Sequence, residues 1–110
     1  MAVQVLIGNQ KGPLPIQASF QAPGDMPMYL EIQGSVWTQT ANQMIGIQVT
    51  LDGAVIGTAN IFSNTASTHR AAVPVYLPVK LTQGQHTLQL SAAANTVSDL
   101  NDFYTAVLHY

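Results

Sequence analysis

The fold class is decided by one stretch of the chain, Ile45-Gly46-Ile47-Gln48-Val49-Thr50-Leu51-Asp52-Gly53-Ala54-Val55-Ile56-Gly57-Thr58-Ala59-Asn60-Ile61. Its first half places apolar side chains at every second position, with Gly, Gln and Thr between them, which is the pattern of a half-buried β-strand. Asp52-Gly53 then has the composition of a two-residue type I′ turn. Because apolar residues recur at alternate positions from Val55 to Ile61, the stretch predicts an antiparallel β-hairpin.

The same alternation, bounded by Gly, Pro, Asn or Asp, recurs along the whole chain. The predicted strands are Val3 to Ile7, Leu14 to Phe20, Met28 to Thr38, Met44 to Leu51, Ala54 to Phe62, Ala71 to Val79, His86 to Ala92 and Phe103 to Tyr110. No segment has a helical period. The pattern therefore predicts an all-β protein, an antiparallel jelly-roll β-sandwich of about eight strands.

Two details of this sandwich follow from the side chains. The predicted strand from Ala71 to Val79 contains Pro74 and Pro78, which cannot donate ladder hydrogen bonds, so we expect it at a sheet edge. The alternation also predicts which side chains the two sheets bury. The expected core residues are Ile45, Ile47, Val49, Leu51, Val73, Val75, Leu88, Leu90 and Val107.

Length and composition limit the organisation of the molecule. The chain has 110 residues and no cysteine, which predicts one domain over residues 1–110 without disulfides or thiolate metal sites. The N-terminal segment has no cationic start and its short apolar run is interrupted by Gln4, so we expect no signal peptide. No apolar stretch approaches the roughly 20 residues that span a bilayer. We expect a soluble protein without membrane insertion, whose location stays unknown.

Charged residues are scarce. They make up 7% of the chain and hydrophobic residues 47%, against a usual charged share of about 25%. Lys11, Arg70 and Lys80 are the only basic residues apart from histidine, too few to neutralise many phosphates, which excludes nucleic-acid binding through a basic patch. A surface this poor in charge would promote association. We therefore expect a homo-oligomer.

Sequence motifs of catalysis are absent. The chain contains no nucleophile elbow, phosphate-binding glycine loop, dinucleotide fingerprint or metalloprotease histidine pair. The histidines, His69, His86 and His109, are far apart in the sequence; convergence in space stays open, but strand-end or interface positions are expected. Few of the five acidic residues are free to form a glycosidase pair. We predict no enzyme, no catalytic residue, no cofactor and no metal.

Two polar loops are the candidate ligand-binding sites. The segment 60–70 offers neutral donors and acceptors and one guanidinium, chemistry that suits hydroxylated ligands such as sugars. The segment 98–102 is the densest group of oxygen ligands; it either caps its own turns or binds a hard cation such as calcium. Trp37, Tyr29 and Tyr76 could provide a stacking face, although Trp37 also suits the core. The predicted ligand-binding residues are Asn64, Thr68, His69, Arg70, Asp99, Asn101 and Asp102.

The second half of the chain resembles the jelly-roll heads of the tumour necrosis factor superfamily and of the globular head of the first complement component. The resemblance rests on Val49 to Gly53, Thr68-His69-Arg70 leading into Val73-Pro74-Val75, Leu81 to Leu90, and the aromatic final segment Asn101 to Tyr110. It implies a compact trimer that displays loops for recognition and performs no catalysis. The chain departs from that family in being shorter, in lacking its stalk, and in a first half that does not align.

Two functions remain open at this level. The first is a non-catalytic, oligomeric recognition or assembly module that binds a glycan, as a lectin does, or a protein surface. The alternative is a purely structural self-assembling subunit, such as a virion, tail-fibre or appendage component. In either case the final strand is apolar on both faces, so we expect one face to pack in the sandwich and Tyr104, Leu108 and Tyr110 to contact a neighbouring copy.

Overall fold

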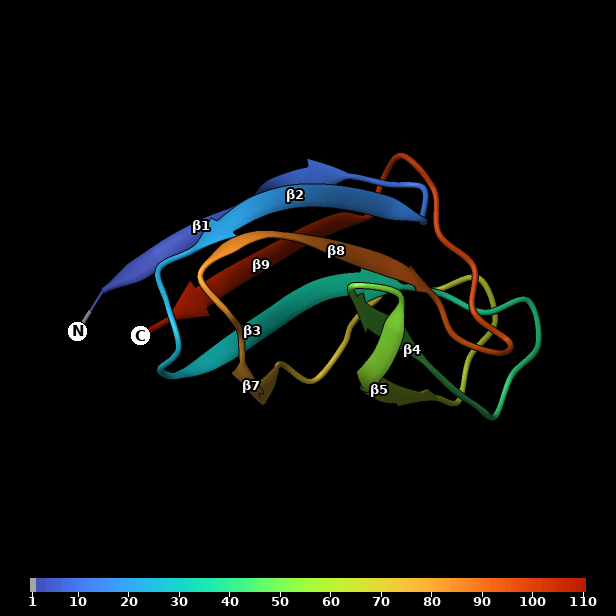
Figure 1. The fold of residues 1–110 in the computed structure, drawn as a ribbon. Helices are drawn as coiled ribbons and strands as arrows, with labels where there is room; N and C mark the ends of the chain where they lie inside the picture. Colours follow the sequence, from blue (N-terminus) through green and yellow to red (C-terminus); the bar gives the residue numbers. More distant parts are fainter. Residues whose placement is uncertain (1) are drawn as a thin grey trace.

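A computed structural model describes residues 2–110 and shows two antiparallel sheets packed face to face (Figure 1). The strands are β1 (Val3–Lys11), β2 (Ile16–Ala22), β3 (Pro27–Val36), β4 (Gln43–Leu51), β5 (Ala54–Ser63), β6 (Arg70–Ala71), β7 (Val75–Lys80), β8 (Gly84–Ala92) and β9 (Phe103–His109). The predicted all-β jelly-roll sandwich is confirmed. The described residues contain no helix, and hence none that could cross a membrane.

The chain passes repeatedly between the two layers. One sheet has the order β1-β9-β3, with β6 and β7 both pairing with β3; the other has the order β2-β8-β4-β5. In Figure 1, β2 and β8 pass in front of β9. The start of β1 and the end of β9 lie at the left of this view, and the loops 37–42, 64–69 and 93–102 gather at the right. We call this right-hand end the loop end.

The hairpin of β4 and β5 has the predicted geometry. β4 and β5 pair from Gln43↔Ser63 to Leu51↔Ala54. Asp52 and Gly53 have φ values of 50° and 84°, the two positive angles that a type I′ turn requires. Asp52 also does more than turn the chain, because its Oδ1 accepts a 2.8 Å hydrogen bond from the Thr87 backbone amide at β8. The turn is thereby fastened to the adjacent strand.

Most of the predicted core is buried between the sheets. The predicted residues of β4 and β8 are all less than 9% exposed. β3 and β9 supply the facing layer, in which Leu30, Ile32, Ala106 and Leu108 are at most 1% exposed. Gly34 leaves room for this packing, since a Cβ there would lie 2.8 Å from Ile47 Cδ1. The two inner faces thus close one continuous hydrophobic core.

Three predicted core positions differ from expectation, and two backbone features explain them. The segment predicted as one strand from Ala71 to Val79 is divided into β6 and β7, because residues 72–74 leave the sheet. Val73 is therefore 60% exposed and Val75 half-buried. Within β9 the inward positions are 104, 106 and 108, which leaves Val107 half-buried on the outer face. The expected edge position is confirmed, because β7 pairs only with β3 among the described strands.

The burial of β9 also overturns the expected oligomer contact. Tyr104 is 1% exposed and Leu108 is 0% exposed, so both side chains belong to the sandwich core and cannot meet a neighbouring copy. Period-two alternation could not choose the inward face here, since both faces of the strand carry apolar groups. The contact expected for Tyr104 and Leu108 was therefore wrong, and Tyr110, the third expected residue, is half-buried against the core.

Candidate functional site

The loop end is held together by backbone contacts between segments distant in sequence. Trp37 and Val97 form an isolated antiparallel bridge, with N–H···O distances of 3.0 and 2.8 Å in the two directions. The Ser67 amide donates to the Thr38 carbonyl over 2.8 Å. These bonds join the loops 37–42, 64–69 and 93–102. The two predicted ligand-binding loops therefore lie at the same end of the sandwich.

Asp102 is the centre of this assembly. Its side chain is fully buried, and its Oδ1 accepts 2.6 Å hydrogen bonds from Ser35 Oγ and from His69 Nδ1. Its Oδ2 accepts the Asp99 backbone amide over 2.9 Å. A buried carboxylate needs such donors to offset its lost hydration. Asp102 consequently positions both loops and does not itself reach the surface.

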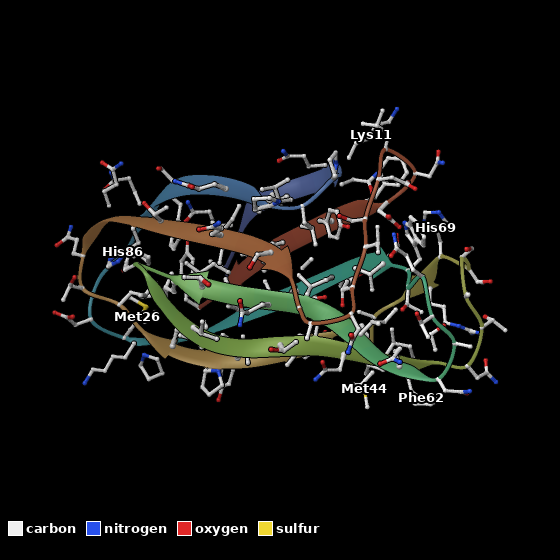
Figure 2. All side chains as sticks on the ribbon, turned by 90° about the vertical axis from the view of Figure 1, so that its right-hand side faces the viewer. Lys11, Met26, Met44, Phe62, His69 and His86 are labelled. Atoms are coloured by element: carbon white, nitrogen blue, oxygen red, sulfur yellow. The ribbon has the colours of Figure 1, made fainter. Side chains whose placement is uncertain are left out.

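His69 projects from the loop end above Asp102. Its ring centroid lies 5.9 Å from that of Trp37, and its Nε2 lies 3.7 Å from Asp99 Oδ2. The hydrogen bond that His69 donates to Asp102 raises the pKa of His69 above its ordinary value of 6.5, and the negative charges of Asp102 and Asp99 add to this shift. Figure 2 shows His69 at the same end of the molecule as Met44 and Phe62, with His86 at the opposite end. The predicted residues His69, Asp99 and Asp102 are thus brought together.

Arg70 and Asn64 form a second group. The Arg70 guanidinium donates to Ser63 Oγ over 3.2 Å, to Asn64 Oδ1 over 3.1 Å and to Thr65 Oγ1 over 3.2 Å. These bonds fold the loop after β5 back onto the start of β6. Arg70 is therefore largely committed to shaping its own loop, while Asn64 stays exposed beside it.

Thr68 and Asn101, the remaining predicted residues, are exposed at the same end. Thr68 Oγ1 donates to the Ala66 carbonyl over 3.4 Å. The Asn101 backbone amide donates to Asp99 Oδ1 over 2.8 Å, a local turn of the kind expected for this Asp- and Asn-rich segment. The Asn101 side chain is left facing solvent.

Sequence reasoning missed a polar hollow next to this cluster. It has a volume of about 230 Å³ and is lined by Thr38, Gln39, Thr40, Asn95, Thr96 and Val97. Five of these six residues carry hydroxyl or amide groups, and none carries a charge. The run of uncharged polar residues after Trp37 was a signal for it, but only the Trp37–Val97 bridge shows that residues 95–97 complete the wall.

The other two histidines lie in separate ion pairs on the sheets. His86 Nδ1 lies 2.6 Å from Asp52 Oδ2, and His86 Nε2 lies 2.8 Å from the Thr82 carbonyl oxygen. His109 Nε2 lies 2.7 Å from Glu31 Oε1 on the outer face of the five-stranded sheet. The hydrogen bond from His109 lowers the pKa of Glu31, with Gln33 as a further donor. Neither histidine joins the cluster at the loop end.

Comparison with known proteins gives similarity in structure alone. No protein-family model matches the sequence, and no curated protein does. A family 35 carbohydrate-binding module from Clostridium thermocellum superposes with a TM-score of 0.53 at 15% identity, over 96% of this chain and 86% of the module. The sugar-binding C-terminal domain of EclA gives 0.54 at 14% identity, over 98% and 79%. Dimeric latent PorU from Porphyromonas gingivalis gives 0.61 at 7% identity over 97% of this chain, which matches only 12% of PorU.

At these identities the likeness concerns the fold. The family 35 module is a jelly-roll sandwich, 86% of which is covered by this chain. The specific resemblance to tumour necrosis factor heads stays a prediction. The chain has the jelly-roll β-sandwich fold that non-catalytic carbohydrate-binding modules use.

Proposed function

We propose that this protein is a non-catalytic recognition module that binds a neutral glycan at its loop end. The observation that carries the proposal is the hollow of about 230 Å³ at the loop end, whose polar lining consists of hydroxyl and amide groups. Such groups both donate and accept hydrogen bonds, as sugar hydroxyls do. An uncharged lining favours an uncharged ligand.

The surroundings of the hollow extend the same chemistry. Asn64, Thr68 and Asn101 are exposed neutral side chains at this end, and His69 and Asp99 add two stronger hydrogen-bonding groups. Trp37 is partly exposed behind His69. We assign contact with the ligand to this group together with the lining of the hollow. Arg70 and Asp102 instead hold the loops in place, since Nε and Nη2 of Arg70 and both carboxylate oxygens of Asp102 are already engaged.

A hydrolytic role for the same surface is disfavoured by the state of its carboxylates. Glycoside hydrolysis uses two carboxyl groups that both reach the scissile bond. Asp99 and Asp102 are neighbours, but Asp102 is fully buried and its two oxygens accept three hydrogen bonds. The pair therefore offers substrate only one accessible carboxylate. The carbohydrate-binding modules of the same fold are consistent with binding as the whole function.

Affinity electrophoresis through gels containing single polysaccharides tests this proposal. The panel should include neutral xylan, β-glucan, galactan and mannan, with polygalacturonate as the acidic member. We expect retardation by at least one neutral polymer and none by polygalacturonate. Replacing Gln39 and Asn95 by alanine should weaken that binding at least tenfold, because both amides line the hollow.

The matched control removes two exposed amides from the opposite end of the sandwich, Gln21 and Gln85, a cross-strand pair on β2 and β8. This control should bind as the wild type does. Retention of full binding by the Gln39 and Asn95 variant, or no retardation by any polymer of the panel, would contradict the proposed site.

Self-assembly is the second candidate, and a different surface favours it. The outer face of the five-stranded sheet exposes Val3, Val5, Tyr29 and Tyr76, each more than half accessible. Apolar and aromatic groups of this kind are enriched in homo-oligomer interfaces. We propose this face, in place of the buried side of β9, as the contact of a homo-oligomer such as the trimer expected from the sequence.

Sedimentation velocity at tens of micromolar tests the assembly. The wild type should sediment as a defined oligomer, and Val5→Glu combined with Tyr76→Glu should convert it to a folded monomer. Sedimentation of the wild type as a monomer would exclude the proposal. If the protein is a purely structural subunit, it should form the oligomer through this face and bind no glycan.

A further inference from the structure

The loop end holds two side chains whose free ligand atoms face each other. His69 Nε2 and Asp99 Oδ2 lie 3.7 Å apart, and both side chains are accessible, at 36% and 42%. We propose that these two atoms form a site for a divalent transition-metal ion of the zinc class. The proposal does not depend on glycan binding, because it rests on the geometry of the unliganded loops and is tested with metal alone.

The imidazole is oriented for this role by a buried carboxylate. His69 Nδ1 donates to Asp102 Oδ1 over 2.6 Å, because a carboxylate can only accept. That bond fixes the tautomer whose lone pair is on Nε2. Metal-binding histidines characteristically donate their second ring nitrogen to a carboxylate, which sets the ring orientation and raises the basicity of the ligand atom. Nε2 is then the atom turned toward Asp99.

Asp99 is oriented by the same buried group. Its backbone amide donates to Asp102 Oδ2 over 2.9 Å, and its own Oδ1 accepts the Asn101 amide over 2.8 Å. Oδ2 is left facing His69. Asp102 therefore fixes both proposed ligands, one through each of its oxygens, and is itself anchored by Ser35. This shared support distinguishes the site from a chance meeting of surface charges.

The spacing suits a small ion. Zinc binds imidazole nitrogen and carboxylate oxygen at about 2.0–2.2 Å, so two ligands on a tetrahedral centre lie about 3.4 Å apart. The observed 3.7 Å requires a shift of only a few tenths of an ångström. Water would complete the coordination on the solvent side. Because one of the two ligands is an imidazole nitrogen, the site should prefer Zn²⁺, Ni²⁺ and Cu²⁺ over Ca²⁺, which takes oxygen ligands.

Trp37 can report metal binding by its fluorescence, and His86 provides a control histidine. Trp37 is the only tryptophan in the sequence, and its ring centroid lies 5.9 Å from that of His69, close enough for bound Cu²⁺ to quench its fluorescence. His86 also donates to a carboxylate, but its second ring nitrogen faces the Thr82 carbonyl. It therefore has no free lone pair for a metal, so His86→Gln is a matched control.

The test titrates Cu²⁺ into the full chain, carried without a histidine tag, while Trp37 fluorescence is recorded, and then displaces the ion with Zn²⁺. We expect saturable quenching that Zn²⁺ reverses and that Ca²⁺ leaves unchanged at the same concentration. His69→Gln should weaken Cu²⁺ binding at least tenfold, Asp99→Asn should weaken it several-fold, and His86→Gln should leave it unchanged. Circular dichroism establishes that each variant is folded.

Three results would overturn the site. They are quenching that does not saturate, quenching that His69→Gln leaves intact, and binding that Asp99→Asn leaves unaltered, since the last would mean that histidine acts alone. If His69→Gln does not fold, Asp99→Asn on the surface decides the question by itself.

Discussion

Replacing Asp102 by alanine should destabilise the protein more than any other change to a single acidic residue. The carboxylate is fully buried and receives three donors, from Ser35, His69 and the Asp99 backbone. Alanine would leave the Ser35 hydroxyl and the Asp99 amide without their acceptor inside the loop end. It would also release His69 and separate the loops 64–69 and 93–102.

The expected loss in the free energy of unfolding follows from removing one partner of a buried charged network, which costs about 3–5 kcal/mol. The lower end applies here, because His69 remains partly exposed and regains hydration when released. A loss of about 3 kcal/mol corresponds to a fall in melting temperature of roughly 12 °C for a domain near 100 residues. The matched control is Asp25→Ala, at an exposed position between β2 and β3, which should change stability by less than about 0.5 kcal/mol.

Urea unfolding followed by circular dichroism measures both variants. For a small domain, about 3 kcal/mol displaces the midpoint by roughly 2 M at an m-value between 1 and 2 kcal/mol/M. An Asp102→Ala midpoint equal to that of Asp25→Ala would show that this carboxylate does not organise the loop end. A rise in midpoint would show the same.

Three further predictions concern the sheets. Gly53→Val should cost roughly 1–3 kcal/mol by thermal unfolding, because φ is 84° there and a new Cβ meets no neighbour, so the whole cost is backbone strain. Gly34→Ala should lower the melting temperature by several degrees, since its Cβ would overlap the buried Tyr104 ring as well as Ile47; equal melting points would contradict the packing. The pair of His86 with Asp52 should stabilise the fold by less than about 1 kcal/mol. Its hydrogen bond raises the pKa of His86 above 6.5 and lowers that of Asp52 below 3.8. The stability difference between wild type and His86→Gln should therefore be largest between pH 3.8 and pH 6.5. It should fall as the pH rises through the raised pKa of His86, and also as the pH drops through the lowered pKa of Asp52. A difference that does not vary with pH would exclude the pair.

The sequence alone was enough to predict the sheets but not how their surfaces are used. Alternation from Ile45 to Leu51 and the Asp52-Gly53 turn are local signals, so the hairpin and its buried face could be predicted. The inward face of β9 could not, because apolar groups on both faces remove the contrast on which alternation depends. The exposure of Val73 could not be predicted either, because the break in the strand before Pro74 depends on tertiary contacts. One of them is the hydrogen bond from the Val73 amide to the Asn60 carbonyl.

For the candidate site too, the sequence predicts the segments involved but not how their side chains are arranged. Composition identified the two polar loops, and the structure brings His69 together with Asp99 and Asp102 across thirty or more residues of sequence. What a single sequence does not encode locally is which carboxylate becomes buried. Asp99 and Asp102 lie three residues apart in one loop, yet one is accessible and the other is the fully buried anchor of both loops. Asp102 is the one that meets Ser35 of β3 and His69, two partners far from it in the sequence.

Chemical-shift mapping shows residue by residue whether the loop end binds a glycan. A ¹⁵N-labelled sample is titrated with a short oligosaccharide of the polymer that retards the protein most strongly. We expect saturable shifts confined to the amides of residues 38–40, 64–69 and 95–101, with the His86 end of the sandwich unchanged. Shifts centred on the outer face of either sheet, or no shifts at millimolar oligosaccharide, would contradict it.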